Sequence, residues 1–510
     1  MPSVPDFTAA MQAGYTFKGE TLQLGAPIFQ GECPPGTVVQ MPLRMLNRHG
    51  LIAGATGTGK TKTLQVIAEQ LSLKGVPTLL MDIKGDLSGI AAPAVPNPKI
   101  DERQKRMNIA WEPLSLPVEM LSLSDEPGAR LRATVSEFGP VLLSRILELN
   151  DTQSSVLSLI FKYCDDNAWP LLDLKDLQAM LAYVNGDGKE AIKARYGGVS
   201  GASVNTIMRK LIELEQQGAG TFFGERSFDP QDLLQQRDGK GVVHVVRLTD
   251  IQDRPRLFST FMLCLLAEIY STFPEVGDAD KPKLIIFIDE AHLIFDNATK
   301  PLLDQIESII KLIRSKGVGI HFCTQDPSDV PDSVLGQLGM KVQHSLRAFT
   351  AKDRATIRKT AQNYPITEFY DSETLLTSMG IGEAMVTVLG DKGMPTPLAH
   401  TLVRAPGTRM DILQPAELSA LVARSNLVPK YNEVIDRESA SEILAKRLRD
   451  HQETEAEETD REPAKPKREK EEPSMLEQVS KNTMVRQVGR TVARELMRGL
   501  LGVLGVKRRR

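Results

Sequence analysis

The residues best suited to chemistry lie in the segment GATGTGKT, residues 54–61. Its spacing fits GxxxxGK[ST] in full, the pattern of a loop that wraps nucleotide phosphates at the start of a helix. Glycines let the backbone turn so that successive N–H groups face the anion. The pattern predicts that Lys60 reaches the β- and γ-phosphates and that the Thr61 hydroxyl binds Mg²⁺. The predicted nucleotide-binding residues are Gly54, Ala55, Thr56, Gly57, Thr58, Gly59, Lys60, Thr61 and Lys62.

A second chemical feature is the acid pair in LIIFIDEAH, residues 284–292. Apolar residues followed by Asp289 and Glu290 indicate a buried strand whose carboxyl end reaches the crevice where open α/β sheets bind ligands. We predict that Asp289 holds Mg²⁺ through water and that Glu290 deprotonates the attacking water. Two solvated acids at a strand end are the simpler alternative, but the phosphate loop in the same chain favours catalysis.

A third polar group ends the segment VGIHFCTQ, residues 318–325. If this strand lies beside the acidic strand, Gln325 is near the γ-phosphate and senses its presence. The sequence equally allows Thr324 and Gln325 simply to end a buried strand.

These residues need a parallel sheet to position them. An apolar run, HGLIAGA, precedes the phosphate loop and a helical pattern, KTLQVIAEQLSLKG, follows it. Further strands are predicted in VPTLLMDI, GVVHVVRLTD, PKLIIFIDE, KVQHSLRAF and EAMVTVLG, with a long apolar helix in PRLFSTFMLCLLAEIYSTF. Short apolar strands separated by helices are typical of parallel sheets with crossover connections.

Composition changes along the chain predict five parts. Residues 1–45 form a leader packed on the core, and residues 46–100 and 236–430 form the α/β core. Residues 101–235 are dominated by helical patterns and are predicted to be a mostly α-helical insertion. Residues 431–474 are rich in charge and poor in apolar residues, which predicts a linker. Residues 475–510 are predicted to form a C-terminal amphipathic basic helix.

The C-terminal segment carries an arginine every four residues, at Arg486, Arg490, Arg494 and Arg498. On a helix these side chains form a basic stripe. Three partners are open: the protein's own core or a neighbouring subunit, anionic lipid, and nucleic acid. Docking on the protein itself is the simplest of the three.

Bulk properties narrow the class of protein. The chain has 510 residues, 41% of them hydrophobic and 25% charged, as in soluble globular proteins. A formal net charge of −3 gives no overall positive field, and the 5% aromatic content offers no basic–aromatic pattern for base stacking. The N-terminus has no signal-peptide pattern and no run of 18 apolar residues occurs, so we expect a cytoplasmic protein.

Taken together, the phosphate loop, FIDEAH and IRSKGVGIHFCTQDPSD resemble the HerA–FtsK branch of RecA-like ATPases. More narrowly, LMDIKGDLSG and LEQQGAGTFFGERSF are similar to a bacterial family of HerA-like ATPases formerly labelled as of unknown function. The resemblance covers about residues 20–430 and the C-terminal helix. It implies an α/β, RecA-like P-loop NTPase core with a central, mostly parallel sheet.

The resemblance also implies roles for single residues. Lys60 and Thr61 are expected at the phosphates, Asp289 at Mg²⁺, Glu290 as the catalytic acid and Gln325 as the sensor. In this superfamily the site lies between subunits, and an arginine from the neighbour stabilises the transition-state charge. Arg314 is the first candidate and Arg347 the second. The alternative for each is an ordinary surface arginine in a local ion pair, and for Arg347 the two interpretations are equally compatible with the sequence.

The expected function is therefore an Mg²⁺-dependent ATP hydrolase working as a homo-oligomeric, hexameric ring and acting on DNA. HerA-type motors usually carry a β-barrel before the phosphate loop, and 45 residues cannot supply a full one. This departure puts in doubt the DNA-end processing partners that bind through the barrel. The alternative is a nucleotide-controlled interaction protein with a protein or membrane partner. A small-molecule kinase is disfavoured, because a glutamate after the acidic strand suits hydrolysis.

Overall fold

The computed structural model describes residues 2–461 except 253, 278, 296–299, 434 and 436. The chain divides into two units, Met1–Ala445 and Lys446–Arg510. The strands are β1 (Thr21–Pro27), β2 (Val39–Pro42), β3 (Gly50–Ala53), β4 (Thr78–Asp82), β5 (Val118–Ser122), β6 (Ala129–Arg130), β7 (Gln236–Arg237), β8 (Lys240–Gly241), β9 (Val243–Arg247), β10 (Leu284–Ile288), β11 (Val318–Thr324), β12 (Met340–His344), β13 (Glu383–Thr387) and β14 (Ala399–Val403).

The helices are α1 (Val4–Gly14), α2 (Lys60–Leu73), α3 (Pro98–Met107), α4 (Val135–Ile146), α5 (Asp151–Asp166), α6 (Leu174–Asn185), α7 (Lys189–Tyr196), α8 (Gly201–Gln216), α9 (Pro255–Thr272), α10 (His292–Phe295), α11 (Lys300–Ile313), α12 (Asp332–Leu335), α13 (Ala351–Gln362), α14 (Ser372–Ser378), α15 (Pro415–Ala423), α16 (Leu427–Tyr431) and α17 (Ala440–Arg461).

One large sheet organises the first unit. In the described part of the chain it has 12 strands in the order β2-β1-β14-β13-β12-β3-β11-β10-β4-β9-β5-β6. All neighbouring pairs from β12 to β6 are parallel. The strands β13, β14, β1 and β2 extend this sheet in antiparallel fashion. The predicted α/β class with a mostly parallel sheet is confirmed.

Register brings four strand ends to the same level. Ala53 at the end of β3 pairs with Thr324 at the end of β11, and Phe322 pairs with Ile288 at the end of β10. Ile288 in turn pairs with Met81, next to the end of β4. The segments after β3, β11, β10 and β4 therefore begin along one edge of the sheet, which is where open α/β sheets bind ligands.

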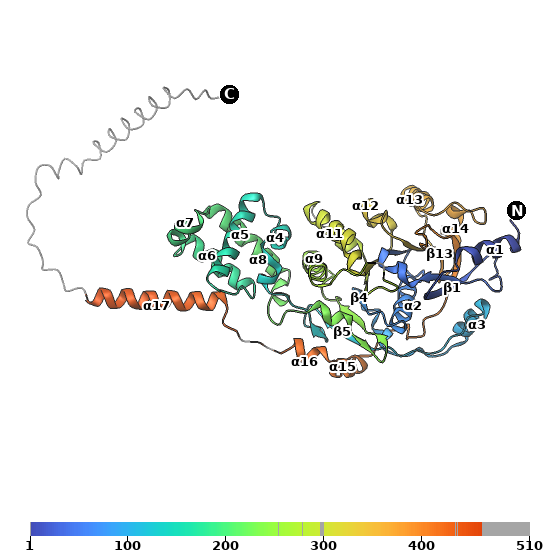
Figure 1. Cartoon of the computed structure of the whole chain (residues 1–510), viewed down its shortest axis with the longest axis horizontal. Coiled ribbons are helices and arrows are strands. Elements are labelled where there is room, and N and C mark those ends of the chain that lie inside the picture. The colour runs from blue at the N-terminus through green and yellow to red at the C-terminus, as the bar shows by residue number, and fades with distance from the viewer. Residues whose placement is uncertain are drawn as a thin grey trace, which may run out of the picture. The chain divides into compact units, whose positions relative to one another are not determined.

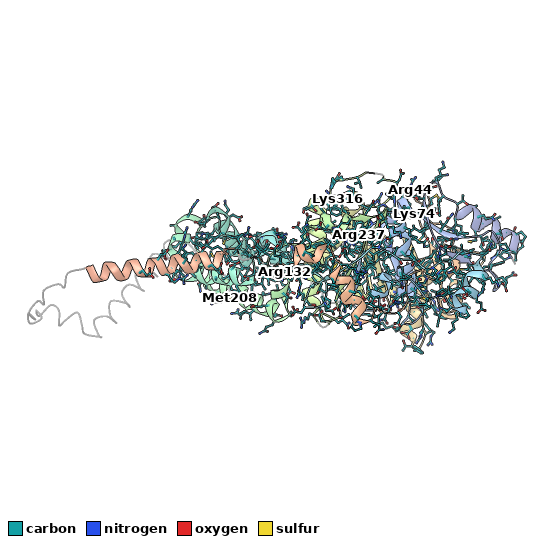
Figure 2. The ribbon with its side chains drawn as sticks, turned by 90° about the horizontal axis from the view of Figure 1, so that it is seen from below. Arg44, Lys74, Arg132, Met208, Arg237 and Lys316 are labelled. Atoms are coloured by element: carbon teal, nitrogen blue, oxygen red, sulfur yellow. The ribbon has the colours of Figure 1, made fainter. Side chains whose placement is uncertain are left out.

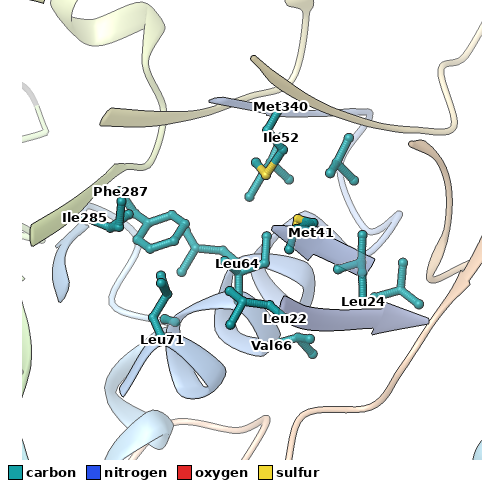
Figure 3. Packing of buried hydrophobic residues seen from close by; sticks show 14 of the residues in the cluster. Leu22, Leu24, Met41, Ile52, Leu64, Val66, Leu71, Ile285, Phe287 and Met340 are labelled. Carbon is teal, nitrogen blue, oxygen red and sulfur yellow. The ribbon is translucent and has the colours of Figure 1, made fainter. Parts of the chain in front are cut away.

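A continuous hydrophobic core fixes these strands. Leu64 and Leu71 of α2 join a buried cluster with Ile52, Ile285 and Phe287 of the parallel strands (Figure 3). Alternate residues of β10 face opposite sides of the sheet, and all five of its residues are buried, so both faces are covered. The strand that carries the acid pair is thus held on both sides.

Two parts of the chain contribute more to the sheet than their sequence indicated. The segment 101–235 contains the helices α4 to α8, with α5, α6, α7 and α8 gathered together (Figure 1), but also β5 and β6. The leader 1–45 contributes β1 and β2, and Leu22 and Leu24 of β1 are fully buried. The division of the chain at residues 45, 100 and 235 stays a prediction.

The predicted linker, residues 431–474, includes helix α17. Low apolar content predicts a linker that cannot bury enough surface to fold, but Ala, Glu, Leu, Lys and Arg are strong helix formers, and a helix does not need a buried core of its own. The first turn is also anchored, because the Ala440 N–H donates to the Pro170 carbonyl at 2.9 Å and Leu444 is buried. The predicted basic helix 475–510, with Arg486 to Arg498, lies outside the described residues. Among the described helices, none combines the length and apolar character needed to cross a bilayer.

A buried histidine makes the stability of this fold depend on pH. His49 precedes β3, and its Nδ1 accepts from the Ile320 N–H at 3.0 Å while its Nε2 lies 2.8 Å from the Ile310 carbonyl oxygen. Burial, with the neighbouring His321, lowers the pKa of His49 to about 4. In the unfolded chain the imidazole has its ordinary pKa of about 6.5, so the unfolded state takes up the proton first.

We expect the free energy of unfolding of the wild type to exceed that of His49→Gln by a constant amount above about pH 6.5. It should shrink as the pH falls toward 4, by at most about 1.4 kcal/mol per pH unit. Urea titrations at several pH values measure it. A difference that stays constant between pH 7 and pH 4.5 contradicts the neutral, buried His49.

Candidate functional site

The loop between β3 and α2 has the backbone that a phosphate site requires. Gly54, Gly57 and Gly59 have φ values of 149°, 78° and 118°, which side-chain-bearing residues rarely adopt. A Cβ at Gly54 would lie 2.5 Å from the Cβ of His344, so only glycine fits there. The helix α2 begins at Lys60, directly after the loop, and its first N–H groups face the same space.

Lys60 lies inside this loop. Its side chain is buried, and its Nζ donates to the carbonyl oxygens of Gly54 at 2.6 Å and Ala55 at 3.2 Å. Burial and the nearby positive charge of Lys84 lower the pKa of Lys60. An ammonium that is paired only with neutral carbonyl groups is a strong binder of anions. The loop therefore offers one buried cation and several backbone N–H groups to a phosphate.

The acid pair directly follows β10 and is almost completely buried. Asp289 is 5% exposed and Glu290 is 4% exposed. The Oδ2 atom of Asp289 is buried without a hydrogen-bond partner among the described residues. Burial, reinforced by the Glu290 carboxylate and opposed by Lys84, raises the pKa of Asp289 to about 6. A buried carboxylate oxygen without a partner fits a hard cation such as Mg²⁺, which prefers oxygen ligands.

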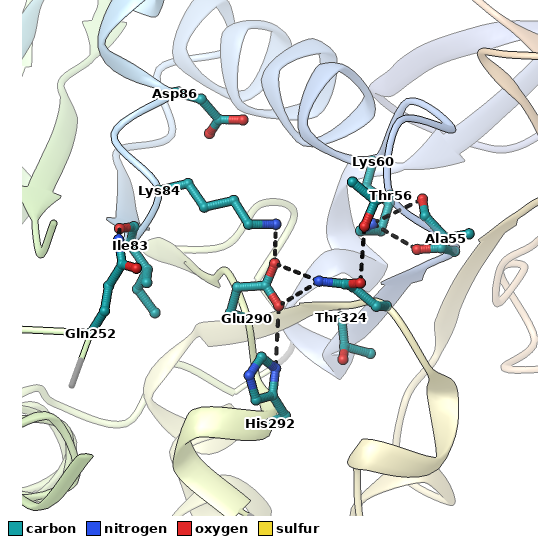
Figure 4. Close-up of polar contacts among 12 residues, drawn as sticks. Ala55, Thr56, Lys60, Ile83, Lys84, Asp86, Gln252, Glu290, His292 and Thr324 are labelled. Carbon is teal, nitrogen blue, oxygen red and sulfur yellow. Dashed lines mark hydrogen bonds and ion pairs between the residues drawn. The ribbon is translucent and has the colours of Figure 1, made fainter. Parts of the chain in front are cut away.

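Glu290 is held by side chains from three segments. Lys84 forms an ion pair with Oε1, and Nδ1 of His292 lies 3.2 Å from Oε2 (Figure 4). Nε2 of Gln325 lies 3.4 Å from Oε1 and 3.5 Å from Oε2. The backbone of Glu290 has a φ of 49°, in the left-handed region that residues with a Cβ adopt at a cost. The carboxylate is therefore fixed in one orientation at the strand end.

Gln325 connects the acid pair to the phosphate loop. Its Oε1 accepts from the Thr56 hydroxyl at 2.9 Å, while its Nε2 faces Glu290. One side chain thus touches both the loop that would bind phosphate and the carboxylate that would activate water. The structure brings Lys60, Asp289, Glu290 and Gln325 together at one edge of the sheet, and their catalytic roles remain predictions.

Lys84 and His292 are site residues to which the sequence pattern assigned no role. Lys84 lies in LMDIKGDLSG and is the second residue after β4, and His292 begins α10. The carboxylate of Asp82 accepts from the N–H groups of Gly85, Asp86 and Leu87 at 2.8, 3.1 and 3.3 Å, which fixes the turn that carries Lys84. The sequence signal that could have identified Lys84 is its position just after a predicted strand. In the structure this strand, β4, neighbours β10, the strand that precedes the acid pair.

Of the other predicted site residues, Lys62 and Arg347 contact backbone carbonyl groups, and among the described residues neither forms a hydrogen bond or ion pair with the acid pair. Nζ of Lys62 donates to the Met410 carbonyl oxygen at 2.5 Å, so its ammonium is engaged outside the loop. Arg347 follows β12 and donates to the Thr56 carbonyl oxygen at 3.4 Å, beside the loop of its own chain.

Arg314 begins the short 3₁₀ helix η5 (Arg314–Lys316), which precedes β11, whereas Gln325 follows β11. Arg314 is therefore at the opposite edge of the sheet from the phosphate loop, and it lines a cavity of about 510 Å³ with Arg44, Arg48 and Lys392. From this edge Arg314 does not serve the site of its own chain.

Comparison with known proteins agrees with this architecture. The family described as Helicase HerA-like C-terminal matches residues 29–509. The DNA double-strand break repair helicase HerA of Sulfolobus acidocaldarius is 22% identical over 363 residues. The matched region is 69% of this chain but 65% of that protein, so the chain spans less than two thirds of its relative.

Two solved structures share the fold. The bacterial conjugative coupling protein TrwBdeltaN70, in its unbound monoclinic form, has 13% identity and a TM-score of 0.52, covering 80% of this chain and 94% of that one. The plasmid coupling protein TrwB in complex with ADP and Mg²⁺ has 14% identity and a TM-score of 0.50, covering 79% and 94%. At this identity the likeness shows a common RecA-like P-loop fold. With the family match over nearly its whole length, the chain belongs to the Helicase HerA-like C-terminal family, within the HerA–FtsK class of P-loop ATPases.

Proposed function

We propose that this protein is an Mg²⁺-dependent ATP hydrolase. The observation that carries the proposal is the meeting of Lys60, Asp289, Glu290 and Gln325 at the carboxyl ends of adjacent parallel strands. The solved TrwB structure with ADP and Mg²⁺ supports the choice of ligands. Bound Mg²⁺ would neutralise charge on the β- and γ-phosphates.

In this proposal each residue of the site has a separate role. Lys60 and the N–H groups of the loop would hold the phosphates, while the Thr61 hydroxyl and Asp289 would hold the metal ion. Glu290 orients the attacking water and accepts its proton. Gln325 couples the position of the Glu290 carboxylate to phosphate binding in the loop, because its side chain contacts both.

We further propose that the protein works as a ring of six copies and moves DNA. Two observations support this proposal. Arg314 lies at the edge of the sheet opposite its own phosphate loop, from where it is free to face the site of a neighbouring copy. In addition, the matched relative HerA is by its description a DNA double-strand break repair helicase. An arginine that arrives from a neighbour would stabilise the charge that develops on the phosphates.

A second candidate function is a nucleotide-controlled interaction protein with slow turnover. The engagement of Glu290 by Lys84, His292 and Gln325 favours it, because a carboxylate whose oxygens are occupied is a poor base. In this case the nucleotide state would control a protein or anionic lipid partner.

The hydrolysis proposal predicts different defects for two substitutions. Lys60→Ala removes the buried ammonium and should weaken ATP binding by roughly ten- to hundredfold or abolish it. Glu290→Gln keeps the shape of the site and should bind ATP normally while kcat falls by roughly 10²- to 10⁴-fold. Equilibrium binding and phosphate-release assays measure the two effects.

A matched pair of controls lies on the surface. Lys74 and Glu20 form an exposed ion pair 2.9 Å long, and Lys74 caps the far end of α2. Lys74→Ala and Glu20→Gln should leave binding and turnover unchanged. Normal turnover by Glu290→Gln would show that Glu290 is not the base.

The motor proposal predicts that duplex DNA stimulates phosphate release by the wild type, because a translocating ring couples turnover to the polymer. At low salt the protein should also bind duplex DNA, and electron microscopy should show ring particles. Equal turnover with and without DNA, together with no DNA binding at low salt, would contradict the motor and leave the interaction protein as the better account.

A further inference from the structure

Both carboxylate oxygens of Glu290 are contacted by side-chain donors in this structure. Its Oε1 is shared by Lys84 and Gln325, and its Oε2 by His292 and Gln325 (Figure 4). A general base must present a lone pair to the proton that it abstracts. Turnover therefore requires at least one of these donors to leave Glu290.

Lys84 is the donor best placed to leave. Its side chain is 39% exposed, whereas that of Glu290 is 5% exposed. A lysine carries its charge on a flexible four-carbon stem, so its ammonium moves without a change of backbone. Glu290 lacks this freedom, because it directly follows the buried strand β10.

The base of the Lys84 side chain is, by contrast, fixed. Three N–H groups of the following residues bind the buried carboxylate of Asp82. The next residue, Gly85, has a φ of 77°, and a Cβ there would lie 2.8 Å from a methyl carbon of Thr249. The turn thus holds the Cα of Lys84 in place and leaves only the end of the side chain to move.

The destination of the Lys84 ammonium follows from the charges around it. Lys60 lies on the loop carbonyls and Lys84 on Glu290, and the two ammonium groups are close enough that Lys84 lowers the pKa of Lys60 (Figure 4). A phosphate group placed between them would pair with both cations. Exchange of a carboxylate for a phosphate keeps Lys84 paired, so its charge is never left without a partner.

We propose that Lys84 is a restraint on Glu290 that is released by the terminal phosphate of a nucleoside triphosphate. In the nucleotide-free protein Lys84 holds Glu290, and when a triphosphate is bound Lys84 pairs with its γ-phosphate and frees the carboxylate. A diphosphate lacks this group, so Lys84 stays on Glu290. The inference rests on the proposed ATP hydrolase function and names Lys84 as the residue that distinguishes the triphosphate from the diphosphate.

The test compares the affinities of full-length protein for a non-hydrolysable ATP analogue and for ADP, both with Mg²⁺. In Lys84→Met the affinity for the analogue should fall by roughly ten- to hundredfold, the range for a lost hydrogen bond between charged groups. The affinity for ADP should stay within about twofold of the wild type, since Lys84 makes no contact with a diphosphate. Lys84→Arg keeps the charge and should restore most of the discrimination.

Lys74→Met is the matched control, because Lys74 (Figure 2) also forms an ion pair with a glutamate and its side chain is 38% exposed. It should bind both nucleotides as the wild type does. Unchanged discrimination in Lys84→Met would overturn the inference and leave Lys84 as a residue that only positions Glu290. An equal loss of both affinities would also overturn it, since that indicates a damaged loop. A wild type that binds neither nucleotide would overturn the proposed function itself.

Discussion

Two carboxylates buried side by side are the constraint on which the rest of this site depends. Asp289 and Glu290 are each about 95% removed from solvent, and adjacent buried charges repel each other strongly. The protein balances them with the ammonium of Lys84 and donors from His292 and Gln325, and burial leaves Asp289 with a raised pKa. A site arranged in this way is prepared for a metal ion and phosphates, whose charges complete the balance.

Much of the fold and part of the site could be predicted from the sequence. The strand, glycine loop and helix around Lys60 form a local pattern, and the apolar run before Asp289 identifies a buried strand. Because neighbouring parallel strands end at one edge, the loop, the acid pair and Gln325 were expected together. The antiparallel extension by β1 and β2 was not predicted, since it depends on the pairing of β1 with β14, which joins segments almost 400 residues apart and which no local pattern reveals.

The remaining site residues depend on three-dimensional placement. Lys84 and His292 lie in segments that carry the family resemblance, but the patterns assigned them no role, and only the order β11-β10-β4 brings Lys84 to Glu290. Lys62 belongs to the loop pattern, yet its ammonium binds the Met410 carbonyl oxygen, because the loop that contains Met410 packs against α2. Arg314 precedes a strand and Arg347 follows one, so β11 separates Arg314 from the edge at which Arg347 contacts Thr56.

The most direct test of a phosphate site at this edge is a crystal structure with Mg²⁺ and a non-hydrolysable ATP analogue. The predicted result has Nζ of Lys60 moved from the carbonyl oxygens of Gly54 and Ala55 to the phosphates, with the metal ion beside Thr61 and Asp289. A structure with the phosphates bound elsewhere, and with Lys60 still on the loop carbonyls, would contradict the account.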